Sequence, residues 1–226
     1  RNQAAPQRRR ATVGAFASVR SPAPLVVDRG RRQRGGQNNP HATAMAAYRQ
    51  FRLARASSES RRTHHALLLR EPELPRDEAN RRAAEMAEQQ LRAKINRSES
   101  VIVETVLSSD KYKPYLKRAR RKGMRIGLIY VALSSPELAI DRIRIRVAMG
   151  GHDVPQEKVR ARWSRSLDNL AWFSARVDRL LVFSNDNPNG EPLWIADGTK
   201  GRVRVLLPDA LPEVTQRLIS HRGRRR

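Results

Sequence analysis

The sequence predicts an α/β domain with a mostly parallel sheet between about residues 71 and 220. Short continuous apolar runs, typical of strands covered on both faces, alternate there with segments of helical periodicity. Strands that alternate with helices form right-handed βαβ units with parallel strands. In such sheets ligands bind at the carboxyl ends of the strands, so we expect the functional residues directly after each strand.

Three apolar runs predict the parallel strands: Val101–Val103, Arg125–Leu133 and Leu180–Phe183. Two later segments, 192–196 and 203–207, are expected to pair as a hairpin across Asp197-Gly198. An Asp-Gly pair between two apolar segments favours a tight turn, which predicts an antiparallel end to the sheet.

Periodicity and capping residues predict five helices, at residues 77–97, 114–122, 136–149, 155–176 and 211–219. The third has the clearest start, because Ser135 is a favoured N-cap residue and Pro136 suits the first helical position. Gly150-Gly151 ends that helix and opens a polar loop that leads to the next one.

The region before this domain, residues 1–70, is rich in arginine and contains no lysine. Its only acids are Asp28 and Glu59. We expect most of it to be poorly ordered, because it has few apolar side chains to bury. Within it, residues 24–28 are predicted to form a first strand and residues 42–56 a weak helix.

Charge suggests one class of partner. The chain has 46 Lys and Arg against 22 Asp and Glu, a formal net charge of +24, and residues 221–226 form a basic tail. Such a chain binds nucleic acid non-specifically at low salt, so a nucleic-acid-binding protein is the alternative function. Few aromatic residues lie among the N-terminal arginines, which disfavours base stacking.

Composition excludes other classes. The absence of cysteine rules out disulfides, thiolate metal sites and a cysteine nucleophile, and it fits a reducing cytoplasm. No apolar run is long enough to span a bilayer, and no signal peptide is expected. His152 has no second ligand at a useful spacing, so we interpret it as a loop residue and predict no metal-ligating side chains.

Glu104 and Thr105 directly follow the first of these parallel strands. A carboxylate at the end of a buried strand is costly without a partner. It either accepts hydrogen bonds from a hydroxyl-bearing ligand or pairs with a neighbouring arginine. Position alone leaves both interpretations open.

Arginines gather on the two helices around the polar loop 150–155. Arg142 and Arg146 share one face of the first helix, and Arg162 and Arg165 share one face of the second. Guanidinium groups bind phosphate oxygens bidentately, so this array would make a phosphate-binding lid. The alternative is a solvated helix surface without a ligand.

A phosphoryl-transfer domain of this class needs a glycine-rich loop that ends in Gly-Lys-Ser or Gly-Lys-Thr after its first strand. That motif is absent from the chain. Residues 29–37 supply glycine at the expected place but no lysine.

Three segments are distinctive together: VIVETVLSS at 101–109, IYVALSSPELAIDRIRIRV at 129–147 and GGHDVPQEKVRARWSRSLDNL at 150–170. They resemble the zeta-toxin-like P-loop kinases. The resemblance implies a three-layer, P-loop NTPase-like fold with a helical lid, which uses ATP and Mg²⁺ to phosphorylate a hydroxyl group. Zeta toxins proper act on UDP-N-acetylglucosamine, and an antitoxin protein is an implied partner.

The resemblance also implies residue roles. Glu104 and Thr105 correspond to substrate-binding residues, and Arg146 and Arg162 to catalytic lid residues on the transferring phosphate. Three more positions correspond to cofactor-binding residues: Arg142, Arg165 and Asn169. The family's phosphate loop and its catalytic aspartate have no match, so we expect little or no kinase activity from the chain as written.

A shifted reading frame is our hypothesis for the missing loop. One set of codons for residues 31–39, CGG CGG CAA CGG GGC GGG CAA AAC AAC, encodes Gly-Gly-Asn-Gly-Ala-Gly-Lys-Thr when read from the second base. GC-rich DNA read out of frame also yields arginine without lysine. We therefore hypothesise that residues from about 28 to 70 are translated in a shifted frame.

Overall fold

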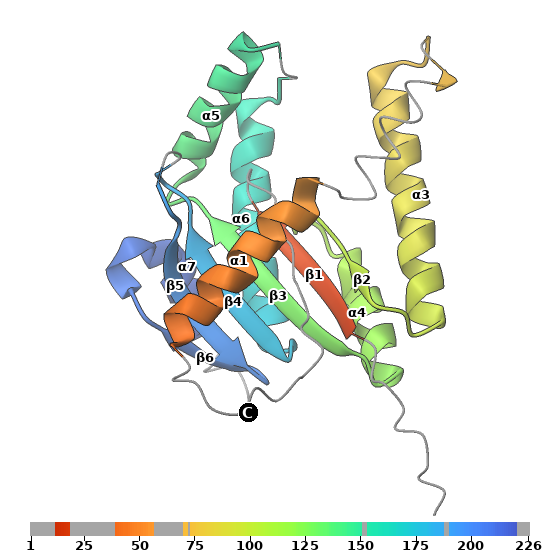
Figure 1. Ribbon diagram of the computed structural model, residues 1–226. Coiled ribbons are helices and arrows are strands. Elements are labelled where there is room, and N and C mark those ends of the chain that lie inside the picture. The colour runs from red at the N-terminus through yellow and green to blue at the C-terminus, as the bar shows by residue number, and fades with distance from the viewer. Residues whose placement is uncertain are drawn as a thin grey trace, which may run out of the picture.

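The computed structural model describes residues 12–18, 39–56, 70–71, 73–150, 153–187 and 190–220. Its centre is a six-stranded sheet in the order β2-β1-β3-β4-β5-β6 (Figure 1). The strands are β1 (Thr12–Ser18), β2 (Val101–Ile102), β3 (Arg125–Ala132), β4 (Arg179–Ser184), β5 (Leu193–Thr199) and β6 (Arg202–Val205). Strands β1 to β4 are parallel to one another, β5 is antiparallel to β4, and β6 is antiparallel to β5 at one edge.

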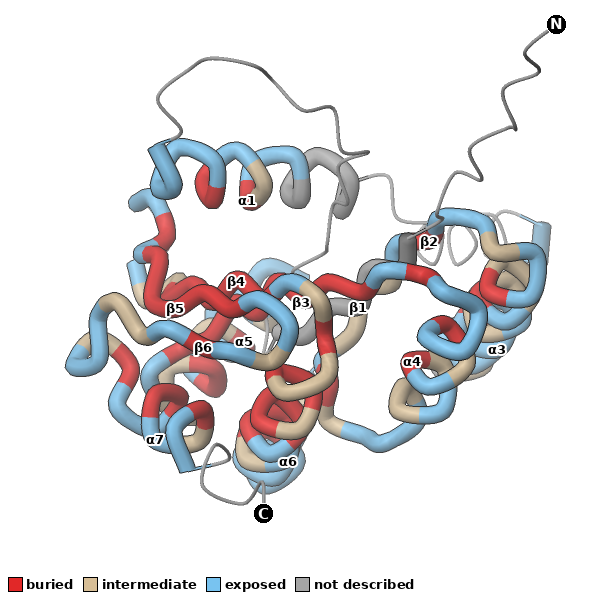
Figure 2. The backbone as a smooth tube through the Cα atoms, turned by 90° about the horizontal axis from the view of Figure 1, so that it is seen from below, coloured by how far each residue is buried: buried red, intermediate tan, exposed pale blue. Residues whose placement is uncertain are grey.

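Helices cover both faces of this sheet. They are α1 (Pro40–Ala56), α3 (Arg76–Asn96), α4 (Tyr112–Arg121), α5 (Pro136–Ala148), α6 (Gln156–Ser174) and α7 (Pro212–Ser220), with a short 3₁₀ helix at Pro208–Ala210. Figure 2 shows α1 on one side of the sheet and α6 and α7 on the other. The predicted three-layer α/β fold with a mostly parallel sheet is confirmed.

Strand β3 shows why its sequence is apolar without a break. Its alternate residues Ile126, Leu128 and Tyr130 are buried in the core cluster that includes side chains of α4, α5, α6 and α7. Ile129 and Val131 point to the other face and are buried with side chains of α1. A strand that is covered on both faces has no position left for a polar side chain, which explains the continuous apolar run.

Phe183 on β4 joins α1 to the sheet. Its side chain is fully buried, and its ring centroid lies 5.0 Å from that of Tyr48 on α1. We expect Phe183→Ala to lower the free energy of unfolding by about 3–5 kcal/mol, the usual loss for a buried phenylalanine. Urea denaturation measures this loss. Leu193→Ala is the control, because Leu193 is 55% exposed and its removal should change stability little; equal losses in both variants would contradict the packing described.

The N-terminal part of the sheet differs from expectation. The predicted strand at residues 24–28 lies outside the described residues, whereas β1 at Thr12–Ser18 pairs with both β2 and β3. Its sequence, TVGAFAS, consists mainly of small residues, so it lacks the bulky apolar run that marks β3. The weak helix expected at 42–56 is present as α1, and Asn39 caps it by accepting a hydrogen bond from the backbone N–H of His41 at 3.0 Å.

The hairpin at the antiparallel edge is confirmed, but its turn was placed wrongly. The turn lies at Lys200-Gly201, where both residues have positive φ, 51° and 76°. Two left-handed residues match the twist of a two-residue hairpin. Asp197 instead lies inside β5, where it is buried and accepts hydrogen bonds from Arg204 directly opposite on β6. A carboxylate that is paired with an arginine can lie within a buried strand. The sequence pattern does not reveal this pairing.

Within the described ranges, no helix is both long and apolar enough to cross a membrane. The helix pair α5 and α6 projects beyond the sheet at one end (Figure 1).

Candidate functional site

The strand order creates a crevice at the carboxyl end of β1. From β1 the chain adds β2 on one side and β3 on the other. Connections that leave a strand in opposite directions open a gap at its carboxyl end, and ligands of open α/β sheets bind at this switch point. The residues that follow β2, β3 and β4 therefore surround the candidate site.

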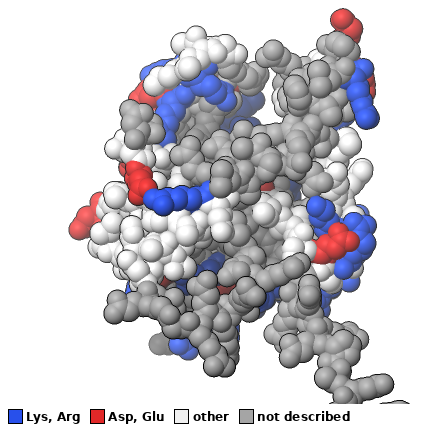
Figure 3. Space-filling view, in the orientation of Figure 1, with Lys and Arg blue, Asp and Glu red and all other residues white. Residues whose placement is uncertain are grey.

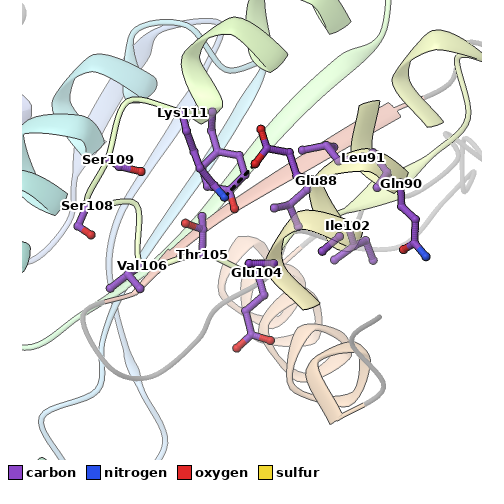
Figure 4. A pocket seen from close by; sticks show the side chains of 15 residues that line it. Glu88, Gln90, Leu91, Ile102, Glu104, Thr105, Val106, Ser108, Ser109 and Lys111 are labelled. Atoms are coloured by element: carbon purple, nitrogen blue, oxygen red, sulfur yellow. Dashed lines mark hydrogen bonds and ion pairs between the residues drawn. The ribbon is translucent and has the colours of Figure 1, made fainter. Parts of the chain in front are cut away.

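A cavity of about 320 Å³ lies beside this crevice, between α3 and the segment that follows β2 (Figure 4). Glu104 and Thr105 both line it, and their substrate-binding role stays a prediction. Figure 4 shows Thr105 between the Glu88–Lys111 pair and Glu104, whose carboxylate extends away from that pair. The cavity thus offers carboxylate and hydroxyl groups along its length, which suits a ligand rich in hydroxyl groups.

Glu88 on α3 anchors one end of the cavity. It accepts a hydrogen bond from the Tyr115 hydroxyl at 2.6 Å and lies 3.4 Å from Lys111 Nζ. The hydrogen bond from Tyr115, followed by the charge of Lys111, holds the pKa of Glu88 below its usual value. Burial and the same hydrogen bond raise the pKa of Tyr115 to about 12. This contact leaves no pattern in the sequence, because Glu88 and Tyr115 lie 27 residues apart on different helices.

These two pKa shifts define the pH range in which the contact stabilises the fold. The lowered pKa of Glu88 means that its contribution is lost as pH falls through the pKa of the folded state. The raised pKa of Tyr115 means that its contribution is complete below pH 10 and is lost as pH rises through about 12. We expect Tyr115→Phe to remove one phenol that ionises near pH 12 in an ultraviolet titration. Tyr112→Phe is the matched control and should leave that component in place; its loss there would contradict the assignment.

The five predicted lid and cofactor-binding residues, four arginines and Asn169, divide into two groups. Arg146 on α5 and Arg162 on α6 are exposed on the projecting helix pair. Basic side chains gather over this end of the molecule in Figure 3. Guanidinium groups bind phosphate oxygens bidentately, and this role stays a prediction for Arg146 and Arg162.

The other three residues, Arg142, Arg165 and Asn169, donate hydrogen bonds to backbone carbonyl oxygens. Arg142 donates to the carbonyl oxygens of Asn185 and Asp186 at 2.5 and 2.9 Å. Arg165 and Asn169 donate to carbonyl oxygens of the segment that follows β2. Their cofactor-binding role stays a prediction, and their described contacts are structural.

Asp186, which was not among the residues predicted from the sequence, connects the ends of β3 and β4. Its carboxylate accepts a hydrogen bond from the backbone N–H of Ser134 at 2.8 Å, while Asn185 N–H donates to Ala132 O at 2.9 Å. Together with Arg142, these bonds fix the two loops that border the site.

A Mg²⁺ site needs several oxygen ligands that lie close together. The described residues contain no group of three His, Asp or Glu side chains that could hold a metal ion. The hydroxyl that binds Mg²⁺ in a phosphate loop is absent with the Gly-Lys-Ser/Thr motif. The side chains of the described residues therefore do not form a Mg²⁺ site of their own.

Gly151 and His152 of the polar loop lie outside the described residues.

Helix α1 does not begin at the crevice. His41 in its first turn lies beside Trp194 of β5, with ring centroids 6.1 Å apart. In a phosphate-loop fold the helix after the first strand presents its N-terminus to the phosphates. Here that N-terminus lies next to the antiparallel edge, which agrees with the missing motif.

A comparison with known families decides the assignment of the fold. The model of the family described as zeta toxin matches residues 62–190, more than half of the chain. The chain belongs to the zeta toxin family. The matched range contains every site residue predicted from the sequence, so the resemblance to zeta-toxin-like P-loop kinases is confirmed.

Two solved structures share the fold of this chain. The complex AvrRxo1-ORF1:-ORF2 with ATP is similar with a TM-score of 0.57 and 14% identity, over 91% of this chain. The same complex with sulphate ions gives a TM-score of 0.51 at 14% identity and the same coverage. This chain spans 64% of the length of the protein it matches in each of these complexes. No curated protein matches the chain.

The PezAT chromosomal toxin-antitoxin system of Streptococcus pneumoniae is a third similar structure, at 15% identity. It has a TM-score of 0.47 over 94% of this chain and 88% of that one.

Proposed function

We propose that the chain has the two binding sites of a small-molecule kinase. Glu104 and Thr105 bind a hydroxyl-bearing acceptor. Arg146 and Arg162 bind the phosphates of ATP. The observation that carries this proposal is the cavity at the end of β2, which contains both predicted acceptor residues. This cavity and the start of α5 both lie at the carboxyl end of the parallel strands.

The acceptor side of the proposal rests on hydrogen-bonding groups. An ionised carboxylate accepts hydrogen bonds only, so Glu104 suits the hydroxyl groups of a sugar. Thr105 Oγ1 accepts a bond from Leu107 N–H at 3.0 Å and keeps its own proton for a ligand oxygen. UDP-N-acetylglucosamine, the acceptor implied by the zeta toxin resemblance, is the candidate that we propose.

The nucleotide side rests on charge. Arg146 and Arg162 would each donate several hydrogen bonds to phosphate oxygens, where positive charge also favours the developing transition state. One similar complex is described with ATP, which supports the same ligand for this chain.

The chain as written lacks both the phosphate-loop lysine and the family's catalytic aspartate. Positioned charge supplies most of the catalysis in phosphoryl transfer. We therefore propose that this chain retains ligand binding but transfers a phosphoryl group slowly or not at all.

Titration calorimetry with Mg-ATP tests the nucleotide side. Arg162→Ala and Arg146→Ala should each weaken binding about tenfold, because a charged hydrogen bond contributes about 1.5–3 kcal/mol. Arg144→Ala is the matched control, since Arg144 lies on the same helix and pairs with Asp141. Equal weakening by all three substitutions would show a general charge effect and reject a specific phosphate site.

Non-specific nucleic-acid binding is the second candidate, and the net charge of +24 favours it. It predicts DNA binding whose logarithmic affinity falls steeply with the logarithm of salt concentration and does not respond to ATP. A partner protein such as an antitoxin is a third candidate, supported by the two-component structure that the chain resembles. An inactive chain that only binds such a partner would keep its thermal stability but would not bind nucleotide.

A further inference from the structure

Helix α6 holds the segment that follows β2 by its backbone. Three successive carbonyl oxygens accept hydrogen bonds from side chains of this helix. The bonds are Ser166 Oγ to Val106 O at 2.8 Å, Asn169 Nδ2 to Leu107 O at 2.9 Å and Arg165 Nε to Ser108 O at 3.1 Å.

The first two bonds are shielded from water. Ser166 is fully buried and Asn169 is 4% exposed. Because the single Ser166 proton goes to a carbonyl, the buried Tyr130 hydroxyl donates to Ser166 Oγ, 3.0 Å away. The chain of bonds thus runs from the central strand β3 through α6 to the segment, and removing one member leaves a buried polar group unsatisfied.

Leu107 shows why the segment needs this support. Its φ angle is 54°, a left-handed conformation that is unfavourable for a bulky residue, and its side chain is fully buried. Such strain persists only when the surrounding structure fixes the conformation. The Leu107 N–H donates to Thr105 Oγ1 at 3.0 Å, so the strained residue directly orients one acceptor residue.

The same face of α6 carries Arg162. Arg162, Arg165, Ser166 and Asn169 have the spacing i, i+3, i+4 and i+7, which places them on one stripe of the helix. One rigid helix therefore bears both the arginine proposed for phosphate binding and the three donors that hold the acceptor segment.

We propose that Arg165, Ser166 and Asn169 are positioning residues that hold residues 106–108 in the strained conformation, and so fix how Glu104 and Thr105 meet the acceptor. The positioning of residues 106–108 follows from the hydrogen bonds alone. Its effect on how the acceptor binds rests on the proposed function.

Amide hydrogen exchange of the full chain tests the positioning role. In Ser166→Ala and Asn169→Ala, the Leu107 amide should exchange roughly fivefold to tenfold faster, the factor expected for one lost hydrogen bond. Ser164→Ala is the matched control, because Ser164 lies on the same helix but takes no part in the three bonds. Unchanged exchange at Leu107 would overturn the inference.

Arg165→Ala keeps the test decisive if the buried substitutions unfold the chain. Arg165 is exposed, so its loss should leave the fold intact while the backbone around Ser108 exchanges faster. Unchanged exchange around Ser108 in this folded variant would also overturn the inference.

Calorimetric titration with UDP-N-acetylglucosamine separates the proposed positioning of residues 106–108 from the proposed acceptor site. Faster exchange together with at least threefold weaker binding in Asn169→Ala supports both parts. Faster exchange in the variants, with no binding by the unsubstituted chain, would remove the proposed acceptor and leave the positioning role. Unchanged affinity despite faster exchange would overturn the effect on the acceptor.

Discussion

Glu104→Ala is expected to weaken the binding of UDP-N-acetylglucosamine at least tenfold. The carboxylate lines the cavity after β2 and would accept hydrogen bonds from acceptor hydroxyl groups. A hydrogen bond to a charged group contributes about 1.5–3 kcal/mol, and about 1.4 kcal/mol corresponds to a factor of ten. Titration calorimetry with the full chain measures the change in Kd.

Two further variants make this result specific. Glu104→Gln keeps the size and one acceptor oxygen, so it should weaken binding less than alanine does. Glu99→Ala is the matched control, because Glu99 lies outside the cavity and pairs with Arg97. If Glu99→Ala and Glu104→Ala change the affinity equally, the acceptor site lies elsewhere.

Replacing residues 31–38 with Gly-Gly-Asn-Gly-Ala-Gly-Lys-Thr should lower the Kd for Mg-ATP at least tenfold. Consecutive backbone N–H groups of such a loop cradle the phosphates, while its lysine and hydroxyl bind phosphate and Mg²⁺. These residues lie between β1 (Thr12–Ser18) and α1 (Pro40–Ala56), the strand-to-helix connection in which the motif belongs.

A second form of this loop supplies the control. It carries alanine in place of the new lysine and should lose most of the gained affinity while keeping the glycines. Equal ATP affinity in the original chain and in both loop forms would contradict a lost phosphate loop at this position. The shifted-frame hypothesis would then fail, and the arginine-rich region would need a different explanation.

The sequence was most informative where one physical signal dominates. Strand β3 and helix α6 were predicted correctly, because a strand covered on both faces and a long amphipathic helix leave strong apolar patterns. The start of α5 was equally clear, since Ser135 accepts a hydrogen bond from Leu138 N–H as a capping residue should. Strand β1 had no such signal, because small residues make up most of TVGAFAS.

The site was predictable only in part. Glu104 and Thr105 were predicted from their position after a strand; both line one cavity, and their role stays a prediction. The bonds from Ser166 and Asn169 to backbone carbonyls were not foreseen, because a backbone acceptor has no residue type of its own. The only trace of them in the sequence is the polar stripe on α6, which a solvated helix face would also produce.

The most direct test of the proposed function is an NMR titration of the isotope-labelled full chain with UDP-N-acetylglucosamine and then with Mg-ATP. The sugar nucleotide should shift the amides of Glu104, Thr105 and Lys111 to saturation. Mg-ATP should shift the guanidinium signals of Arg146 and Arg162. Shifts confined to residues outside the cavity and the α5–α6 helix pair, or no saturable shift with either ligand, would contradict the proposed function.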